Sequence, residues 1–448
     1  MPRLLLITAS SPEIRKVRRV RVLNFQQITM PYLATRVPRS WDVTHVDEEA
    51  EEIDWSIAAD VVGITFHTPS AFHAYDIARR FRSRGVCVVM GGPHVSLLPE
   101  EASQYADVIF IGEAEGLWED FLKSFESGTY LRRYQQAGVP SIEHIPQPRR
   151  DLFHRRDHTD GVLFATRGCP GQCDFCTIAV MYRHKLRKRP IAEVAAEYAS
   201  VKGNVIIFWD DNIAGDLEYS KKLFRAIAPY GKWWSSQVSV HAGRDDEFLE
   251  IAARSGCKQL FLGLESISQQ SMAEVNKGFN RVEEYAQIID RIHAHGIAVQ
   301  AGIVFGFDHD TPEIFEETID FLERAGVQNA TFNILTPFPG TPLFRRMEAE
   351  GHGKAAITVI GSVVVDAAAE PGVRLSVAKE GAGRHGVSLS WPSAPSRPSA
   401  AACLASGWPP GRCVKRPIRL RPRRPERPPI LPTVATREHR WAWPGATA

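Results

Sequence analysis

Three cysteines in one short stretch are the residues of this chain best suited to chemistry. Cys169, Cys173 and Cys176 lie in the segment Gly-Cys-Pro-Gly-Gln-Cys-Asp-Phe-Cys-Thr, with C-x3-C-x2-C spacing. Three thiolates on one loop can hold three irons of a [4Fe–4S] cluster and leave the fourth iron without a protein ligand. The spacing therefore predicts a cluster with one iron open to chemistry.

Other uses of these cysteines fit the sequence less well. Closed zinc sites take four protein ligands, usually as two separated pairs, and His184 is the sole nearby candidate for a fourth ligand. Structural disulfides are typical of secreted chains, whereas no signal-peptide pattern precedes the cysteines and seven cysteines in 448 residues is a sparse, odd count. We expect a reducing, cytoplasmic location.

Composition separates the chain into a body and a tail. The formal net charge of +2 hides an asymmetry, because residues 351–448 hold 15 Lys+Arg against 5 Asp+Glu and 13 of the 30 prolines. Such Pro/Arg-rich sequence buries too little apolar surface to offset chain entropy, so the tail is predicted to be disordered. No apolar run approaches the roughly 20 residues that span a bilayer.

Two further interpretations of residues 351–448 stay open. A nucleic-acid-binding arm would use the arginines, although a solvated tail is the more common role of such sequence and no nucleic-acid partner is expected. The organised periodicity also stops abruptly after Glu350. A shifted reading frame would explain this break.

The elements that position the cysteines begin with an α/β region over residues 1–130. Helical stretches such as Ser70–Arg84 separate short apolar runs, which predicts a doubly wound parallel sheet with its ligands at the carboxyl ends of the strands. The predicted strands are Arg3–Ala9, Asp42–Glu48, Asp60–Phe66, Val86–Gly92 and Asp107–Glu113.

A linker over residues 131–160 leads to a second βα series over residues 161–350. Six βα units are too few to close an eight-stranded barrel and predict a partial, open (βα)6 barrel, with the cysteine loop after its first strand. The predicted strands are Gly161–Gly168, Asn204–Asn212, Lys232–Val240, Lys258–Ser266, Ala298–Phe307 and Asn329–Pro337.

With its cysteine motif after strand one, the segment 161–350 resembles the radical S-adenosylmethionine superfamily. The resemblance implies that the open iron is chelated by S-adenosylmethionine, which is cleaved to a 5′-deoxyadenosyl radical. It also implies cofactor contacts from Phe175 (adenine), Asp210 or Asp211 (ammonium), and Gln237, Ser239 and Glu265 (carboxylate and ribose). The Gly-Gly-Glu form of the ammonium segment is absent here, and a strand-end or helix-cap role for the aspartates stays open.

Two glycines of the fifth barrel strand are further candidates. Gly302 and Gly306 have no Cβ and would let the backbone approach the adenine closely. The alternative role is tight packing inside the barrel.

Residues 1–130 resemble the flavodoxin-like cobalamin-binding domain that precedes some of these barrels. The resemblance rests on Val62–Thr68, Gly91–Glu101 and Gly112–Gly116, and implies cobalamin contacts from Thr65, Gly91, Gly92 and Gly112. The D-x-H-x-x-G motif that supplies a histidine to cobalt is missing after strand one. A domain without cofactor is the alternative, with His67, His73 and His94 as ordinary surface histidines.

Together the two resemblances predict a cobalamin-dependent radical S-adenosylmethionine enzyme that methylates an unactivated carbon. Cobalamin would deliver the methyl group to a substrate radical formed by hydrogen abstraction. Radical cyclisation or oxidation, as in the anaerobic cyclase of bacteriochlorophyll synthesis, is one alternative. A non-catalytic cobalamin or redox sensor is another.

The resemblance also implies two kinds of partner. One is a small-molecule substrate, which the basic run Arg183–Arg189 would contact if the substrate is anionic and if the run is not simply a solvated face. The other is an electron donor such as flavodoxin or ferredoxin.

Overall fold

The computed structural model describes residues 1–12, 15, 27–153, 161–327 and 329–351, together with three strands at 363–366, 374–380 and 384–390. The chain divides into two compact units, residues 1–371 and 372–448. In the second unit the described part is an antiparallel pair, β16 (Arg374–Glu380) with β17 (Arg384–Ser390). Apart from Gly351 and the three strands, the tail predicted to be disordered lies outside the described residues.

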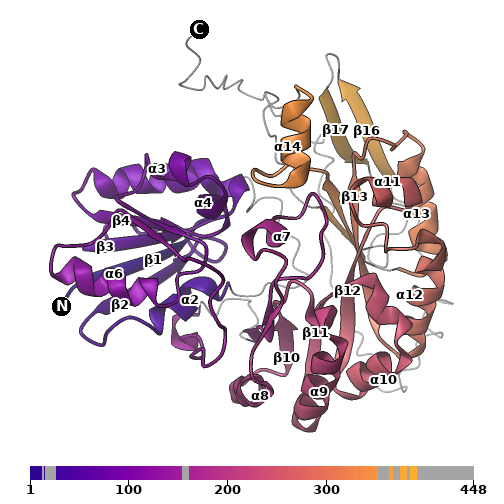
Figure 1. The fold of residues 1–448 in the computed structure, drawn as a ribbon, viewed down its shortest axis with the longest axis horizontal. Helices are drawn as coiled ribbons and strands as arrows, with labels where there is room; N and C mark the ends of the chain where they lie inside the picture. Colours follow the sequence, from indigo (N-terminus) through magenta and orange to yellow (C-terminus); the bar gives the residue numbers. More distant parts are fainter. Residues whose placement is uncertain are drawn as a thin grey trace, which may run out of the picture. The chain divides into compact units, whose positions relative to one another are not determined.

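The first unit begins with a parallel sheet in the order β2-β1-β3-β4-β5-β6, of which Figure 1 labels β1 to β4. In this order the sequence of strands reverses between β1 and β3, as in flavodoxin-like folds. The strands are β1 (Arg3–Thr8), β2 (Asp42–Asp47), β3 (Val61–Thr65), β4 (Cys87–Gly91), β5 (Val108–Ile111) and β6 (Arg133–Gln135). The first five confirm the predicted sheet, and β6 continues it beyond residue 130.

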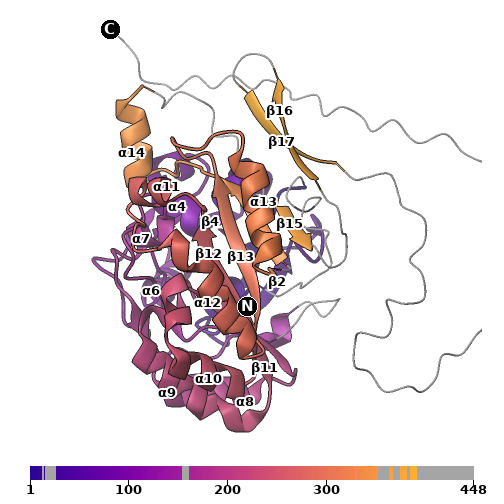
Figure 2. The ribbon, with the colours of Figure 1, turned by 90° about the vertical axis from the view of Figure 1, so that its right-hand side faces the viewer.

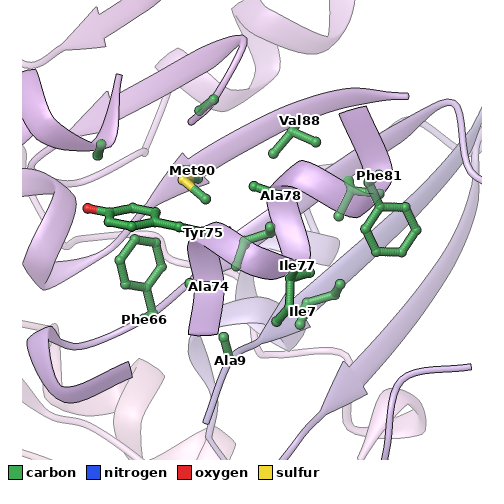
Figure 3. Packing of buried hydrophobic residues seen from close by; sticks show 14 of the residues in the cluster. Ile7, Ala9, Phe66, Ala74, Tyr75, Ile77, Ala78, Phe81, Val88 and Met90 are labelled. Carbon is green, nitrogen blue, oxygen red and sulfur yellow. The ribbon is translucent and has the colours of Figure 1, made fainter. Parts of the chain in front are cut away.

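Both faces of this sheet are covered, which explains its near-continuous apolar strands. On one face Ile77, Ala78 and Phe81 of α3 pack against Ile7 and neighbouring strand residues (Figure 3). On the other face Trp118, Phe121 and Leu122 of α6 pack against strand residues such as Phe110. The helices are α2 (Thr29–Ala34), α3 (Ala71–Arg82), α4 (Pro93–Leu97), α5 (Pro99–Ala102) and α6 (Leu117–Glu126).

The second sheet has the order β15-β14-β13-β12-β11-β10-β7, and all its neighbours are parallel except β14 and β15. Among the described strands β7 and β15 form its two edges and do not pair with each other, so the barrel is open as predicted. The strands are β7 (Val162–Leu163), β10 (Val205–Phe208), β11 (Trp233–Val238), β12 (Cys257–Glu265), β13 (Ala298–Phe305), β14 (Asn329–Ile334) and β15 (Val363–Asp366).

Helices follow these strands and cover the outside of the sheet, as Figure 2 shows for α12 and α13 beside β12 and β13. Alternate strand residues face them; Trp234 of β11, for example, packs against Phe224 of α9. The helices are α7 (Thr177–Met181), α8 (Ile191–Ser200), α9 (Leu217–Ile227), α10 (Asp246–Arg254), α11 (Gln269–Glu274), α12 (Tyr285–Ala294), α13 (Ile314–Arg324) and α14 (Pro342–Ala349).

The first predicted barrel strand, Gly161–Gly168, is divided in the structure. Its start forms β7, whereas its end forms β8 (Thr166–Arg167), which pairs antiparallel with β9 (Arg187–Lys188). The division occurs where the Asp210 carboxylate, in place of a neighbouring strand, accepts the backbone N–H groups of Ala165 and Thr166. The cysteine loop therefore lies between the two strands of a short antiparallel pair at the carboxyl end of the barrel strands.

Candidate functional site

The loop with the three cysteines is shaped by two glycines. Gly168 has a φ of +87°, and a Cβ there would lie 2.1 Å from the Lys185 carbonyl oxygen, so neither the conformation nor the space admits another residue. A Cβ at Gly171 would lie 3.4 Å from Cys169 Sγ and 3.9 Å from Cys173 Sγ. The loop thus wraps two thiols around one small residue.

The thiols lie close enough to affect one another. Burial, with the neighbouring Cys176, Glu265 and Cys169, raises the pKa of Cys173 to about 11 against the opposing charge of Lys277. Cys176 is the N-cap of α7, and the backbone N–H groups of Ala179 and Ile178 partly oppose the rise in its pKa that burial causes. Thiolates in this pocket need a positive partner, which iron supplies.

Among the described residues no three His, Cys, Asp or Glu side chains converge on a single metal ion. Each thiolate of a [4Fe–4S] cluster holds a different iron, so the three cysteines need not share one metal ion. His184, the possible fourth zinc ligand, instead hydrogen-bonds the Gly171 carbonyl oxygen through Nδ1 at 3.0 Å. The donor set and its loop fit the predicted cluster.

Two later segments hold the cysteine loop from the side. The Asp174 N–H donates to the Val275 carbonyl at 3.1 Å, and the Leu343 N–H donates to the Asp174 carbonyl at 3.0 Å. The Asn276 amide donates to the Gln172 carbonyl at 3.1 Å. Phe175 packs into an apolar cluster with residues such as Val275 and Val304, so its contact with adenine stays a prediction.

Asn212 and Ser239 lie beside the first cysteine. The Asn212 amide donates to Ser239 Oγ at 2.6 Å and to Cys169 Sγ at 3.6 Å, and its oxygen accepts the Ser239 N–H at 3.1 Å. The ends of the second and third barrel strands are thereby joined next to the cluster loop. Ser239 was among the predicted contacts, whereas Asn212 was not selected from its segment.

The two aspartates before Asn212 have different surroundings. Asp210 is fully buried, and its carboxylate accepts hydrogen bonds from Ala165 N–H and from the Thr166 N–H and hydroxyl; burial raises its pKa to about 7. Its oxygens therefore close the β7–β8 turn rather than face a ligand, and it is neither a solvated strand end nor a helix cap. Asp211, which accepts the Gly168 N–H at 2.8 Å, is the candidate left for the ammonium contact.

Glu265 ends β12 with a left-handed φ of +66° at a register shift in the sheet. Its carboxylate accepts a hydrogen bond from Lys277 Nζ at 2.5 Å, and that ammonium also donates to the Gly263 carbonyl at 3.1 Å. Burial lowers the pKa of Lys277, but the charges of Glu265 and Cys173 outweigh this effect and raise it. Lys277 was not among the predicted site residues, because it follows α11 and reaches the site only through the fold.

The remaining barrel predictions differ in outcome. Gln237 is half-buried on β11, on the side of the sheet away from Trp234. A Cβ at Gly302 would lie 2.7 Å from the Phe261 ring, so the close approach predicted for adenine is made by Phe261 instead. Gly306 has a φ of +102°, and its N–H donates to Asp310 Oδ2 at 2.8 Å. Glycine is therefore needed at this position to form the turn.

The four residues predicted to contact cobalamin gather at one edge of the first sheet. Thr65 ends β3, Gly91 ends β4, and Gly92 and Gly112 follow β4 and β5. A Cβ at Gly92 would lie 2.5 Å from Thr65 Oγ1, and Ser96 Oγ joins the Gly92 carbonyl to the Gly112 N–H at 2.9 Å each. The edge fits a ligand at the carboxyl ends of the strands.

The histidines near this edge are hydrogen-bonded to protein groups. His73 Nε2 lies 2.8 Å from a Glu48 oxygen. His94 lies 3.1 Å from both Thr68 Oγ1 and Tyr75 OH and is buried, so it is not the surface residue of the alternative prediction.

The loop after β5 is ion-paired to β8 and β9, the two strands that flank the cysteine loop in the sequence. Arg167 donates to Glu113 at 2.6 Å and to Glu115 at 2.5 Å, and Arg187 donates to the other Glu113 oxygen at 2.5 Å. All four side chains are at least four-fifths buried. These contacts join the predicted cobalamin edge to residues on both sides of the cysteine loop.

Comparisons with known proteins agree with both halves of this geometry. The model of the B12 binding domain matches residues 14–122, and that of the radical SAM superfamily matches residues 163–322. Among curated proteins, the bacteriochlorophyllide d C-12(1)-methyltransferase of Chlorobaculum tepidum is 32% identical over 70% of this chain and 72% of its own length. The C-8(2)-methyltransferase of the same organism is 31% identical over 71% and 75%.

Solved structures show the same fold. The radical S-adenosylmethionine methyltransferase TsrM of Kitasatospora setae, with cobalamin and a [4Fe–4S] cluster bound, has a TM-score of 0.63 at 18% identity, over 84% of this chain and 77% of that one. The cobalamin-dependent radical enzyme OxsB gives 0.58 at 16%, over 72% and 52%. No helix in the described part of this chain is long and apolar enough to cross a membrane.

Proposed function

Because the chain belongs to the cobalamin-dependent radical S-adenosylmethionine methyltransferases, we propose that it methylates an unactivated carbon of a cyclic tetrapyrrole. The substrate class rests on one observation: two relatives that are 32% and 31% identical to this chain both carry names of bacteriochlorophyllide d methyltransferases. The family uses a [4Fe–4S] cluster, S-adenosylmethionine and cobalamin, which together supply the radical and the methyl group.

The chain's own residues have positioning roles in this proposal. Cys169, Cys173 and Cys176 hold three irons. Asn212, with Ser239, fixes the strand ends beside Cys169, where the amino-acid part of S-adenosylmethionine would lie.

The substrate would lie inside the barrel. Gln237 and Gln300 flank Phe261 at one level of β11, β12 and β13, and Gln259 lies two residues earlier on β12. All three glutamines are half-buried on the side of these strands away from the outer helices. Neutral amides on this surface suit a large, mainly apolar ring with few polar groups.

Radical cyclisation is the second candidate, because an anaerobic magnesium-protoporphyrin IX monomethyl ester cyclase of Cereibacter sphaeroides is 24% identical over 64% of this chain. That relative also acts, by its name, on a tetrapyrrole, but it is more distant than the methyltransferases and matches over only 53% of its own length. A one-electron donor of the flavodoxin or ferredoxin type and a cytoplasmic location complete the proposal.

A substrate panel tests the proposed class. The anaerobically reconstituted enzyme is incubated with S-adenosylmethionine and a reductant, and with a bacteriochlorophyllide, a hopanoid or a cytidylyl phosphonate in turn. We expect the chlorin alone to increase 5′-deoxyadenosine formation and to gain a methyl group. Stimulation by the hopanoid or the phosphonate instead would contradict the substrate class.

A further inference from the structure

The basic run Arg183–Arg189 separates into two parts in the structure. Three of its cations are paired with carboxylates: Arg187 with Glu113 and Arg189 with Glu197 in largely buried pairs, and Lys188 with Asp216 at the surface. The side chains of Arg183, His184 and Lys185 are exposed, and neither Arg183 nor Lys185 makes an ion pair within the described residues. We name these three residues the cation loop.

The cation loop is attached directly to the cysteine loop. His184 Nδ1 contacts the Gly171 carbonyl at 3.0 Å, between the first two cysteines in sequence. The Lys185 carbonyl is packed so closely on Gly168 that no Cβ would fit between them. Two backbone hydrogen bonds, from the N–H groups of His184 and Lys185 to residues at the end of α7, fix the turn. The positive charges are therefore held on the outside of the cluster site.

The backbone of the cation loop is strained. Arg183 and His184 have φ values of 53° and 58°, a left-handed conformation that costs a residue with a Cβ roughly 1–2 kcal/mol. Their side chains are exposed, so burial does not offset this cost. Strain kept at exposed, charged positions beside a reactive group points to a function for those positions.

We propose that the cation loop is the docking surface for a small acidic electron-transfer protein that reduces the cluster. In this step the donor loses one electron, the cluster gains that electron, and no bond forms or breaks. Uncompensated cations attract an acidic partner and speed its approach, an effect that salt screens. The inference rests on the proposed function only in requiring a cluster bound by Cys169, Cys173 and Cys176.

The other contacts of the cysteine loop, which are with barrel residues, support docking of an electron donor rather than substrate binding as the role of the cation loop. There the loop contacts Asn212, and Lys277 lies close to the thiols with its charge already paired to Glu265. The amides that line the barrel strands are neutral. The cation loop thus places exposed, unpaired positive charge against the cysteine loop on a segment that contains neither Asn212 nor Lys277.

The test compares a charge reversal with a matched control in the reconstituted holoenzyme. R183E/K185E reverses the two unpaired cations. K123E/K222E makes the same change of net charge at exposed lysines on α6 and α9. For each protein, calorimetry measures the binding of flavodoxin at low and high salt, and stopped-flow absorbance measures cluster reduction by reduced flavodoxin or by photoreduced deazaflavin, a small chemical donor.

We expect R183E/K185E to bind flavodoxin at least tenfold more weakly, to lose most of the salt dependence and to slow its reduction by flavodoxin tenfold or more. Reduction by deazaflavin should not change, and R183Q/K185Q should fall between wild type and the reversal. Equal loss in K123E/K222E, or unchanged flavodoxin binding in the reversal, would overturn the proposal. The proposal would also be overturned if the reversal left flavodoxin binding and reduction unchanged but raised the KM for the bacteriochlorophyllide. That result would show that the two cations contact the substrate. Normal docking in an enzyme that makes no methylated product would refute the proposed function alone.

Discussion

Asn212 and Ser239 are held together by two hydrogen bonds, of 2.6 and 3.1 Å, directly beside Cys169. One amide thereby connects two barrel strands to the first cluster ligand. Removal of Asn212 should loosen the side of the site where S-adenosylmethionine would bind without removing any cysteine.

We expect Asn212→Ala to retain its iron but to form 5′-deoxyadenosine about 10- to 100-fold more slowly, because it loses hydrogen bonds worth ~1 kcal/mol each and leaves Ser239 N–H unpaired. Iron content and deoxyadenosine formation under excess reductant measure the two effects. Ser200→Ala, which breaks an exposed hydrogen bond to Gln147, is the control. A normal rate in the Asn212 variant would show that this amide has no role in the site.

Gly168→Ala should prevent the cysteine loop from forming. The added Cβ would meet the Lys185 carbonyl at 2.1 Å, and φ is +87°. Gly128 has a similar φ of +72°, and a Cβ added there would have no atom within 4 Å. Gly128→Ala is therefore the matched control, expected to lower the free energy of unfolding by roughly 1 kcal/mol. Iron bound after reconstitution should fall sharply in the first variant alone. Equal iron in both would contradict the close packing of Gly168.

Lys277→Met should destabilise the protein more than the double variant Lys277→Met/Glu265→Gln does. The single variant leaves the Glu265 carboxylate buried without its partner, whereas the double variant removes both charges. Breaking such a pair costs about 3–5 kcal/mol, whereas loss of an exposed pair costs under ~1 kcal/mol. Thermal unfolding of the holoenzyme should therefore rank Lys277→Met below Lys277→Met/Glu265→Gln. Arg244→Met, which breaks the more exposed pair with Glu284, should stay close to wild type. A double variant less stable than the single one would contradict this account.

Asp210 should make stability depend on pH. Burial raises its pKa to about 7 from an ordinary value of 3.8, so between these values the folded protein binds a proton that the unfolded chain has released. The free energy of unfolding then falls as the pH rises toward 7, by about 1.4 kcal/mol per pH unit at most. Above about pH 7 the contribution of Asp210 no longer changes with pH. Denaturation at pH 6 and 8 should show this fall in wild type and not in Asp210→Asn. Parallel pH profiles would refute the shifted pKa.

The sequence predicted the features that depend on local pattern. Apolar runs located five of the six strands of the first sheet and the six parallel strands of the barrel, and the cysteine spacing located the cluster loop. The three residues of β6 are too few to show a pattern, and the division of Gly161–Gly168 depends on a carboxylate more than 40 residues away.

Within the site, the missed details depend on which way a side chain faces and on strand register. Asp210 and Asn212 both end the same segment, but only the fold shows that Asp210 closes a backbone turn whereas Asn212 contacts Cys169. Lys277 is 12 residues beyond Glu265, and the chain returns through α11 to bring them together. The Phe261 ring fills the space at Gly302 because β12 and β13 pair in one particular register.

The central claim is methyl transfer by a radical mechanism, and label transfer tests it most directly. The reconstituted enzyme, loaded with cobalamin, is incubated with a bacteriochlorophyllide, a reductant and S-adenosylmethionine carrying a trideuterated methyl group. We predict that the chlorin gains the intact trideuteromethyl group while 5′-deoxyadenosine forms, and that the Cys173→Ala variant gives neither product. Formation of 5′-deoxyadenosine with an oxidised or cyclised chlorin that carries no deuterium would contradict the account.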